Sequence, residues 1–551
     1  MEKFPTVRGP LAKGIQLEEN VYVAMRDGVR VAVDVYRPED GKRYPVLLSI
    51  APYPKEMQLW PPALSHSIEA GNTNFLVPQG YVHVIAQIRG TCMSQGQYNW
   101  FDVKEQQDGY DLVEWCAQQP WCDGNVGMMG DSYFAMTQYQ VAALQPPHLK
   151  CIAPFDGTTD LYRDFTYQGG VLFAWFLGTW GTDMLTAANL PERVEGRLPP
   201  ANFINDVVSH TNDGPYYWER SACTRLDKIK VPVLNMVAQR SIVHSRGQLW
   251  TYTQLKSPKK LLVMPFSGLS QHELFITSPP LNAYLLRWYD HWLKGRDTGI
   301  MKEPPVAIFD TGTQKWRYEN EYPLVRTQWT NFFFRKNTPG LATKPPYGLL
   351  SPEPPAKEEP DSYLRPDAIG LVARGQPVIA FMTPALDRDI RVWGPLSAVI
   401  YASSTSLDIS WFIKIADIGP DGNVVPLTQG SLKSSHRAVD EARSRPGQPF
   451  HTYQNPVGPE AGKAYEYQIE IMPIFHTFKS GHRISVQISN DDFWFQEHIR
   501  TKYTLESVPL PAQQMIYHDS SKPSRLLLPV IVEAPEIQPM GPPISEIKWP
   551  I

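Results

Sequence analysis

Apolar and polar residues alternate on both sides of an Arg-Asp-Gly turn near the start of the chain, over residues 20–38. A period of two around such a turn predicts an antiparallel β-hairpin. The next apolar segments, residues 44–50 and 81–85, are short and almost continuous. Runs of this kind are typical of strands that are buried on both faces of a mainly parallel sheet.

Helical periodicity follows these strands. Residues 103–118 repeat apolar positions at three- and four-residue intervals, which predicts a helix. A short strand over residues 124–129 then leads into the turn Gly130-Asp131-Ser132, and a second helix is expected from Tyr133. This order of strand, helix, strand, sharp turn and helix predicts an α/β core.

The pattern changes in the next third of the chain. Residues 156–224 are rich in aromatic and helix-forming residues without strand alternation, which predicts a helical insertion. Buried-strand patterns return at residues 229–236 and 260–265, and we expect the second to be the last strand of the core sheet. An amphipathic helix is expected over residues 281–294.

From about residue 328 the chain consists of short strands separated by Gly, Pro and Asp turns, which predicts a β-sandwich or jelly roll. The 52 prolines, about twice the average usage, crowd into this half. The Pro-rich residues 339–374 are expected to wrap the surface. We therefore predict three units, which are an α/β core from residues 1–155 and 229–320, a helical cap from 156–228, and a jelly-roll β domain from 328–551.

Composition excludes several functional classes. The 52 Lys and Arg residues nearly balance the 56 Asp and Glu residues, and the formal net charge of −4 leaves no basic stripe for nucleic acid. No apolar run approaches the ~20 residues that cross a bilayer, and the first twenty residues lack the apolar core of a secretion signal, so we expect a cytoplasmic protein. The five cysteines form no CxxC pair, so free thiols are expected. We expect no metal and no cofactor.

The turn at Ser132 carries the candidate chemistry. A serine between a buried strand and a helix is the context of a nucleophile elbow, in which the following backbone N–H, here that of Tyr133, faces a developing oxyanion. The strict G-x-S-x-G pattern fails because Phe134 occupies the place of the second glycine. The alternative interpretation of Ser132 is an ordinary helix N-cap.

Longer segments point to a family. They are RDGVRVAVDVYRP from Arg26, APYPK at 51–55, IRGTCMSQGQ at 88–97, DGYDLVEWCAQQPWCDGNVGMMGDSY at 108–133, KIKVPVLN at 228–235, GSLKSSHR at 430–437 and YHDSSKPSRLLLPV at 517–530. In these segments the chain resembles the cocaine-esterase and X-Pro dipeptidyl-peptidase group of α/β-hydrolases. The resemblance implies an α/β-hydrolase core with a helical cap insertion and a C-terminal jelly-roll domain. Its elbow pattern is G-x-S-Y-x-G, from which only Ala135 departs.

The resemblance also implies roles for individual residues. Ser132 would be the nucleophile, and the hydroxyl of Tyr53 would join the Tyr133 amide in the oxyanion hole. The family supplies an acid and a histidine where this chain has Ser241 or Ile242 and Gly268. Both positions are therefore altered.

A serine hydroxyl needs a base near neutral pH, and a carboxylate normally orients that base. Two histidines are candidates for the base, His272 in the loop of the family histidine and His244 in the loop of the family acid. We expect the larger loss of activity from replacing His272. Glu273 and Asp310 are possible orienting carboxylates, and the spacing singles out neither.

Three functions remain open on these grounds. The first is an esterase or amidase that acts through an acyl-Ser132 intermediate on a small molecule. An aromatic cap containing Tyr167, Phe173, Trp175, Phe176 and Trp180 would favour an apolar substrate, although such residues are more often core. The second is a non-hydrolytic enzyme of specialised metabolism that catalyses cyclisation, isomerisation, C–C cleavage or acyl transfer on the same scaffold. The third is a binding protein without catalysis. A homodimer is compatible with any of them.

Overall fold

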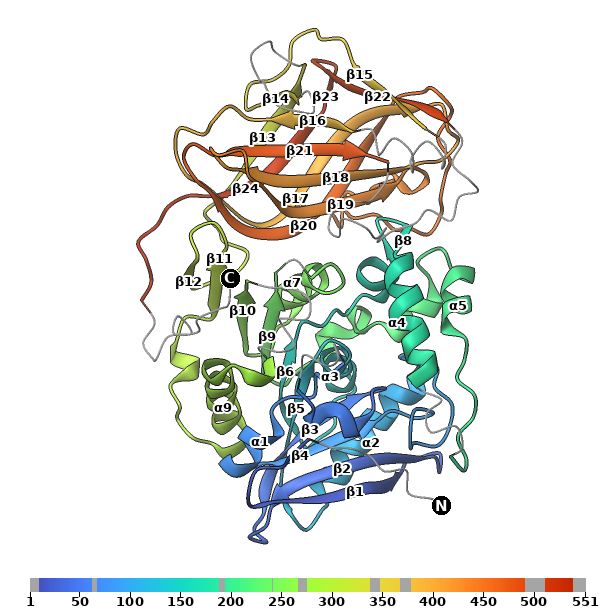
Figure 1. The fold of residues 1–551 in the computed structure, drawn as a ribbon, viewed down its shortest axis with the longest axis vertical. Coiled ribbons are helices and arrows are strands. Elements are labelled where there is room, and N and C mark those ends of the chain that lie inside the picture. Colours follow the sequence, from blue (N-terminus) through green and yellow to red (C-terminus); the bar gives the residue numbers. More distant parts are fainter. Residues whose placement is uncertain are drawn as a thin grey trace.

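The computed structural model describes residues 9–61, 67–187, 194–239, 241–265, 275–336, 347–366, 378–490 and 511–538 (Figure 1). A ten-stranded sheet forms the core, in the order β1-β2-β4-β3-β5-β6-β9-β10-β11-β12. Its strands are β1 (Ile15–Ala24), β2 (Arg30–Pro38), β3 (Tyr44–Ala51), β4 (Val82–Gln87), β5 (Cys122–Asp131), β6 (Leu149–Phe155), β9 (Val233–Ala238), β10 (Lys259–Met264), β11 (Val306–Asp310) and β12 (Lys315–Glu319). The strands from β4 to β11 are parallel, and the edges are antiparallel.

Helices cover both faces of this sheet. They are α1 (Thr73–Leu76), α2 (Val103–Ala117), α3 (Tyr133–Ala143), α7 (Ser245–Gln254) and α9 (Pro279–Lys294), with short helices η1 (Lys55–Leu59), η3 (Val77–Gln79) and η6 (Ile300–Lys302). Side chains of α2, α3 and α7 pack with Leu48, Met128 and Val237 on one face. Those of α1 and α9 pack with Leu47 and Met129 on the other. Adjacent strand residues thus point to opposite faces, as doubly buried strands require.

Most of the elements expected in the core are confirmed. The predicted hairpin is the antiparallel pair β1 and β2, and the predicted helix over residues 103–118 is α2. The prediction that residues 260–265 form the last core strand is wrong. The sheet continues through β11, which pairs with β10 in parallel, and through β12. These strands are only five residues long, so their alternation is brief.

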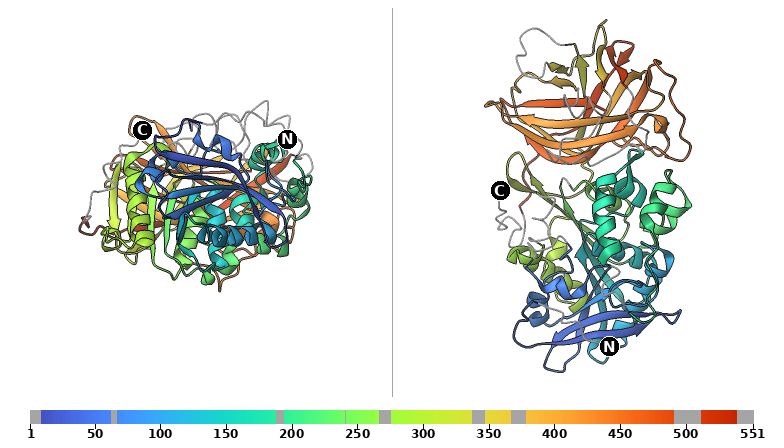
Figure 2. Two further views of the ribbon diagram at one scale, coloured as in Figure 1. Left: turned by 90° about the horizontal axis from the view of Figure 1, so that it is seen from below. Right: turned by 45° about the vertical axis from the view of Figure 1, so that its right-hand side comes forward.

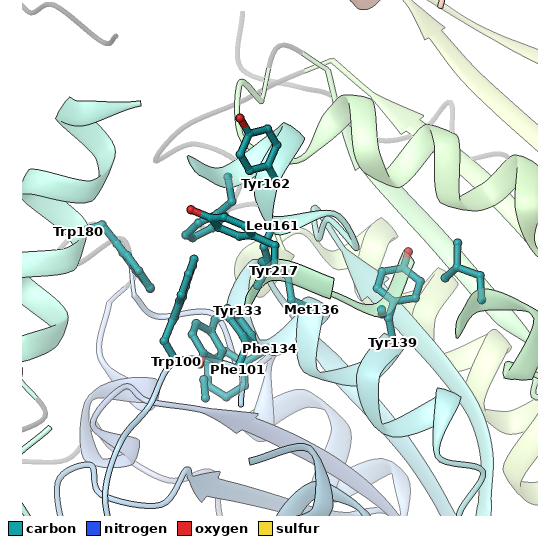
Figure 3. Close-up of a cluster of buried hydrophobic side chains, with 14 of the residues drawn as sticks. Trp100, Phe101, Tyr133, Phe134, Met136, Tyr139, Leu161, Tyr162, Trp180 and Tyr217 are labelled. Carbon is teal, nitrogen blue, oxygen red and sulfur yellow. The ribbon is translucent and has the colours of Figure 1, made fainter. Parts of the chain in front are cut away.

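The chain between β6 and β9 forms a cap beside the carboxyl ends of the strands. Its elements are the π-helix η4 (Leu161–Thr166), β7 (Tyr167–Gln168), β8 (Val171–Leu172), α4 (Ala174–Ala187), α5 (Phe203–Ser209), α6 (Pro215–Arg220) and η5 (Ala222–Lys228). The insertion is mainly helical, as expected, but it also contains the short antiparallel pair of β7 and β8. Aromatic side chains of the cap, including Trp180, lie against Tyr133 at the start of α3 (Figure 3).

The C-terminal half is a strand-rich domain with a barrel-like sheet. Its elements are β13 (Thr327–Arg335), β14 (Tyr347–Ser351), β15 (Asp361–Arg365), β16 (Ile379–Met382), β17 (Ile390–Ser404), β18 (Ser410–Ile418), β19 (Val424–Lys433), η7 (Ser434–His436), β20 (Tyr465–Phe478), β21 (Arg483–Ser489), β22 (Ala512–Asp519), β23 (Lys522–Pro523) and β24 (Arg525–Ile531). Because β24 pairs with both β13 and β17, the sheet closes on itself. Closure removes exposed strand edges. Among the described helices of the chain, none is long and apolar enough to cross a membrane.

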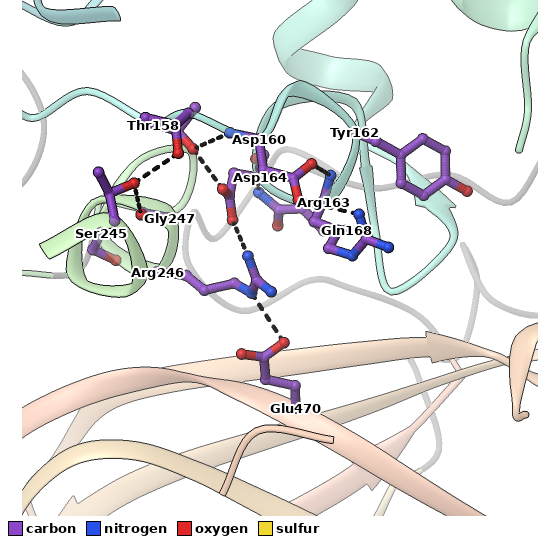
Figure 4. A network of polar contacts seen from close by, with 12 residues as sticks. Thr158, Asp160, Tyr162, Arg163, Asp164, Gln168, Ser245, Arg246, Gly247 and Glu470 are labelled. Carbon is purple, nitrogen blue, oxygen red and sulfur yellow. Dashed lines mark hydrogen bonds and ion pairs between the residues drawn. The ribbon is translucent and has the colours of Figure 1, made fainter. Parts of the chain in front are cut away.

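A buried ionic network joins the three parts of the molecule (Figure 4). It lies where β20 of the β domain faces α7 of the core (Figure 1), at the boundary between the two domains that the right-hand view of Figure 2 also shows. Arg246, on α7, donates to Asp164 of the cap at 2.9 Å and to Glu470 of β20 at 2.9 Å. In the cap, Arg163 pairs with Asp213 at 2.8 Å. Burial disfavours each of these charges, so every member depends on its partners.

Replacing Arg246 with methionine should lower stability strongly. The change leaves the Asp164 carboxylate, whose side chain is 1% exposed, without its cation. Breaking a buried pair in this way typically costs about 3–5 kcal/mol. The matched control is Arg26→Met, which breaks an exposed pair with Asp111 that is worth about 0–1 kcal/mol. Thermal and denaturant unfolding midpoints measure the difference, and similar losses in both variants would contradict the importance of this network.

Candidate active site

Ser132 occupies a strained turn at the carboxyl end of β5. Its φ of 55° and ψ of −114° lie in a region that non-glycine residues rarely adopt. The backbone N–H of Ser132 donates to the carbonyl of Phe155, the last residue of β6, at 3.0 Å. The side chain makes no capping hydrogen bond to α3, unlike an ordinary N-cap serine. This geometry matches that of a nucleophile elbow, which leaves the hydroxyl available for chemistry.

Two glycines allow the chain to turn so tightly. Gly130 has a φ of 135°, and a Cβ there would lie 2.2 Å from the Cβ of Phe134. A Cβ at Gly157, just after β6, would lie 2.6 Å from the Cβ of Ala135. Gly157 therefore makes room for the methyl group at the one position where this chain departs from the resembled family's elbow pattern.

Two residues that can supply hydrogen-bond donors, Tyr133 and Tyr53, pack against each other beside the elbow. The N–H of Tyr133 is the first of α3 and has no carbonyl within the helix to bond. The ring of Tyr53 packs edge-on against that of Tyr133, with centroids 6.2 Å apart. Tyr53 is only 2% exposed, and its hydroxyl accepts a hydrogen bond from Trp180 Nε1 at 3.2 Å. A backbone N–H and a phenol in this arrangement can stabilise an oxyanion.

Tyr133 is itself held firmly. Its ring stacks on Phe101 with centroids 3.9 Å apart, and its hydroxyl donates to Glu105 at 2.9 Å. Burial raises the pKa of Glu105 to about 8, and Asp102 adds to the rise, while the bonds from Tyr133 and from the Phe101 amide oppose it. These contacts fix the residue whose amide faces the site.

His244 meets a buried carboxylate in the same region. Asp156 directly follows β6 and is fully buried, and its amide donates to the carbonyl of Met236 in β9 at 2.7 Å. His244 precedes α7, and its Nδ1 lies 3.1 Å from Asp156 Oδ2 and 3.4 Å from Ser241 Oγ. Within the described residues, the buried Nε2 of His244 has no hydrogen-bond partner. This is the arrangement of an imidazole that a carboxylate orients through one nitrogen while the other stays available.

A third carboxyl group lies near the elbow. Glu69 is 2% exposed, and its main-chain carbonyl accepts from the amide of Asp131 at 3.0 Å. Burial raises the pKa of the Glu69 carboxyl well above its usual range, and the nearby Asp131 and Asp156 raise it further. Glu69 therefore holds a proton at pH values where a solvated glutamate is ionised.

The sequence candidates are thus only partly brought together. Ser132, Tyr133 and Tyr53 lie together at the elbow, and His244 pairs with a carboxylate. His272 and Glu273, like Gly268, lie outside the described residues.

Asp310, one of the two possible orienting carboxylates, bonds to the β domain and not to His244. Its carboxylate accepts bonds from Trp393 Nε1 at 2.9 Å, from the hydroxyl and amide of Thr477, and from two amides of its own turn. It therefore joins β11 to the β domain.

Sequence reasoning missed Asp156 and Glu69. The segment Phe155-Asp156-Gly157 carried a signal for Asp156, because it places an aspartate directly after a buried parallel strand. Functional sites of open α/β sheets lie at the carboxyl ends of such strands. Glu69 carried no such signal, since its carboxyl is placed by an irregular segment. Over the described ranges, no group of three or more His, Cys, Asp or Glu side chains is arranged to hold a metal ion.

Apolar rings of the cap cover the elbow (Figure 3). Trp180 of α4 lies nearly parallel to Tyr133, at 6.2 Å and 27°, and stacks on Phe176 at 5.5 Å. Phe165 packs edge-on against Trp180 at 5.3 Å and lies 6.2 Å from the His244 ring. The elbow therefore faces aromatic surface of the cap.

Comparisons with known proteins agree with this architecture. Residues 27–267 match the family model "X-Pro dipeptidyl-peptidase (S15 family)", and residues 298–527 match "X-Pro dipeptidyl-peptidase C-terminal non-catalytic domain". The chain is 30% identical to cocaine esterase of Rhodococcus sp. (strain MB1 Bresler), over 93% of this chain and 98% of the relative.

Solved structures share the fold. A CocE/NonD family hydrolase from Staphylococcus aureus matches with a TM-score of 0.83 at 23% identity, over 94% of both chains. An α-amino acid ester hydrolase matches with a TM-score of 0.71 at 18% identity, over 96% of this chain and 99% of the other. These likenesses confirm the predicted α/β-hydrolase core with a separate strand-rich domain.

Glu105 should make stability fall as pH rises. The pKa of Glu105 is about 8 in the folded protein against an ordinary 4.5, so between pH 4.5 and pH 8 the folded state binds the proton more tightly than the unfolded state. The free energy of unfolding therefore falls as the pH rises from 4.5 to 8, by about 1.4 kcal/mol for each unit of pKa difference. Glu105→Gln removes this titration, so its melting temperature should fall less between pH 5 and pH 8 than that of the wild type. Glu39→Gln, at an exposed turn, is the control and should follow the wild type. A parallel decline in Glu105→Gln would contradict the assignment.

Proposed function

This chain belongs to the X-Pro dipeptidyl-peptidase (S15) family of α/β-hydrolases, and on that premise we propose that it hydrolyses an ester or amide bond in a small, largely apolar substrate through an acyl-Ser132 intermediate. Ester and amide hydrolysis is the common chemistry of the family's named members. The residues that carry the reaction in this chain are proposed to be Ser132, His244, Asp156, Tyr53 and Tyr133.

The contact between His244 and Asp156 carries the proposal. Asp156 lies directly after β6, and the amide of Ser132 bonds to the residue before it, so the two loops that hold Ser132 and Asp156 are neighbours. Nδ1 of His244 faces Asp156, which selects the tautomer that leaves Nε2 unprotonated. Such a nitrogen can accept the proton of the Ser132 hydroxyl.

The reaction then follows the order of other serine hydrolases. Ser132 Oγ attacks the substrate carbonyl carbon, its proton passes to His244 Nε2, and Asp156 stabilises the imidazolium. The carbonyl oxygen becomes an oxyanion between the Tyr133 amide and the Tyr53 hydroxyl. His244 returns its proton to the leaving alcohol or amine as the bond to it breaks. A water molecule, deprotonated by His244, then attacks the acyl carbon. The bond between that carbon and Ser132 Oγ breaks, His244 returns the proton to Oγ, and the acid leaves.

In this assignment the catalytic base and the orienting acid lie in other loops than in the resembled family. The resembled family supplies an acid in the loop after β9, which in this chain also contains His244, and a histidine in the loop after β10. Here a base after β9 and an acid after β6 would do the same work. Parallel strands end at the same edge of a sheet, so both pairs of loops can reach the serine. A conserved reaction therefore does not require conserved positions.

The cap supports an apolar substrate and an ester bond. Trp180, Phe165 and Phe176 present aromatic rings above the elbow. Apolar walls with a few directed polar groups are typical of small-molecule sites. The relative at 30% identity is named for an ester substrate, whereas the relatives named as dipeptidyl-peptidases are 22–24% identical. An ester of an aromatic or aliphatic acid is therefore the first substrate class to test.

Ser132 should react covalently with a fluorophosphonate probe. The native protein should be labelled at Ser132, as located by peptide mass spectrometry, and Ser132→Ala should lose both the label and the hydrolysis of p-nitrophenyl esters. Heat-unfolded protein is the control and should not be labelled, because activation depends on the folded site. An unlabelled native protein, together with full native activity in Ser132→Ala, would favour the non-hydrolytic alternative.

His244 and Asp156 should act as one unit. A catalytic base contributes about 10²–10⁴ in rate, so His244→Ala and Asp156→Asn should each lower kcat/KM on that scale. The double variant should lose little more than the worse single variant, because members of such a unit are not additive. His148→Ala is the matched control. It removes a histidine that also pairs with a carboxylate, Glu114 at 2.7 Å, just before the opposite end of β6, and it should retain activity within about twofold.

His272→Ala decides between the two histidines. If His244 is the base, this variant should lose less than about tenfold, well below the contribution of proton transfer. The reverse order, with His272→Ala losing more than about 10² and His244→Ala little, would assign the base to His272 as the sequence analysis expected.

A further inference from the structure

The indole of Trp180 contacts the side chains of both residues that supply donors to the proposed oxyanion hole. Its Nε1–H donates to the hydroxyl of Tyr53 at 3.2 Å, and its ring lies over that of Tyr133 at 6.2 Å and 27°. Trp180 is 5% exposed and belongs to α4, a cap helix, whereas Tyr53 and Tyr133 belong to the core. The cap thus makes a directed polar contact with the core at the elbow itself.

The direction of this hydrogen bond constrains the phenol. A tyrosine hydroxyl has one proton and two acceptor positions, and the proton rotates about the C–O bond. Since an indole N–H can only donate, the Tyr53 oxygen must act as the acceptor in this contact. The phenol proton is therefore turned away from Trp180. Among the described residues, no hydrogen bond is found that Tyr53 donates.

We propose that Trp180 is a positioning residue that holds the Tyr53 hydroxyl as a hydrogen-bond donor toward the oxyanion. This inference rests on the proposed function, because it requires an oxyanion at Ser132. An accepted bond also polarises the hydroxyl and strengthens the bond that it donates. The contribution should therefore be largest when charge develops on the substrate oxygen, and it should affect turnover more than substrate binding.

The electrostatics of Tyr53 agree with this role. Burial raises the pKa of Tyr53 well above its usual range, and the nearby Glu69 raises it further, while the bond from Trp180 opposes the rise. Tyr53 therefore stays a neutral donor near neutral pH. The bond from the indole makes its hydroxyl a stronger hydrogen-bond donor than burial alone would leave it.

Packing alone is the competing explanation, because Trp180 also contacts several rings. Trp100 offers a matched control in the same aromatic cluster. It is fully buried, stacks on Phe203 at 5.4 Å and lies 5.8 Å from Phe165. In the described part of the chain its Nε1 has no hydrogen-bond partner. Trp100→Phe and Trp180→Phe thus remove similar ring surface, but only the second removes a bond to Tyr53.

A double-mutant cycle separates the two explanations. With a p-nitrophenyl ester as substrate, Tyr53→Phe should lower kcat by about 10²–10³, as expected for one oxyanion donor. Trp180→Phe should lower kcat by about threefold to tenfold, the scale of one hydrogen bond, with KM changed less than twofold. In the Tyr53→Phe background the same change should cost less than twofold, because its target is gone. Trp100→Phe should stay within twofold of the wild type.

Multiplicative losses in the double variant, or an equal loss in Trp100→Phe, would overturn the positioning role. The rate of fluorophosphonate labelling at Ser132 distinguishes failure of the positioning role of Trp180 from failure of the acyl-serine mechanism. If the wild type is labelled and Trp180→Phe is labelled at the same rate, only the role of Trp180 fails. If the wild type is not labelled at all, the acyl-serine mechanism fails and the role of Trp180 fails with it.

The indole N–H resonance of Trp180 gives a readout that does not depend on activity. In protein carrying ¹⁵N-labelled tryptophan, the signal lost in Trp180→Phe identifies it, and that signal should shift in Tyr53→Phe. The signal of Trp100, identified in the same way, should not move. A Trp180 signal that is unchanged by Tyr53→Phe would show that the two side chains are not bonded in solution, and would overturn the inference.

Discussion

The candidate site depends on two backbone hydrogen bonds that continue the core sheet one residue beyond its strands. The amide of Ser132 bonds to the last carbonyl of β6, and the amide of Asp156 bonds to a carbonyl of β9. These bonds bring the loop of a strained serine next to the loop of a buried aspartate. We call these two bonds and the strand ends that they join the frame of the site. His244 depends on this frame too, since it lies in the loop after β9 and contacts Asp156 from there. The positions of the polar groups are thus a property of the parallel sheet.

Buried ion pairs connect the cap and the β domain to the first turn of α7, which follows His244. Arg246 is two residues beyond His244, and its guanidinium bonds to the cap on one side and to β20 of the β domain on the other. A shift of the β domain would therefore act on the first turn of α7, next to the candidate base. The contact of Arg246 with β20 comes from the part of the chain that matches a domain described as non-catalytic. The cap contributes a second link through the bond between Trp180 and Tyr53.

Much of the core could be predicted from sequence because its signals are local. The hairpin, α2 and the turn at Ser132 each follow from the periodicity of a few residues. The pairing of His244 with Asp156 could not be predicted in this way, because 88 residues separate them and only the sheet order brings them together. The contacts of Asp310 could not be predicted for the same reason, since its partners Trp393 and Thr477 come from the β domain. The brief strands β11 and β12 carried too few residues for a clear alternation. The acid and histidine of the resembled family are missing from their usual positions, and the candidate base His244 lies in the loop that holds the family's acid.

The close approach of Ala135 and Gly157 has a consequence for how such an elbow diverges between relatives. A Cβ at position 157 would lie 2.6 Å from the methyl group of Ala135, and also 3.1 Å from the carbonyl carbon of Ala135 and the amide nitrogen of Met136. A glycine at position 135 would remove the first contact but leave the two backbone contacts in place. Exchange between glycine and alanine is therefore easier at position 135 than at position 157, where the backbone of α3 itself leaves little room for a side chain.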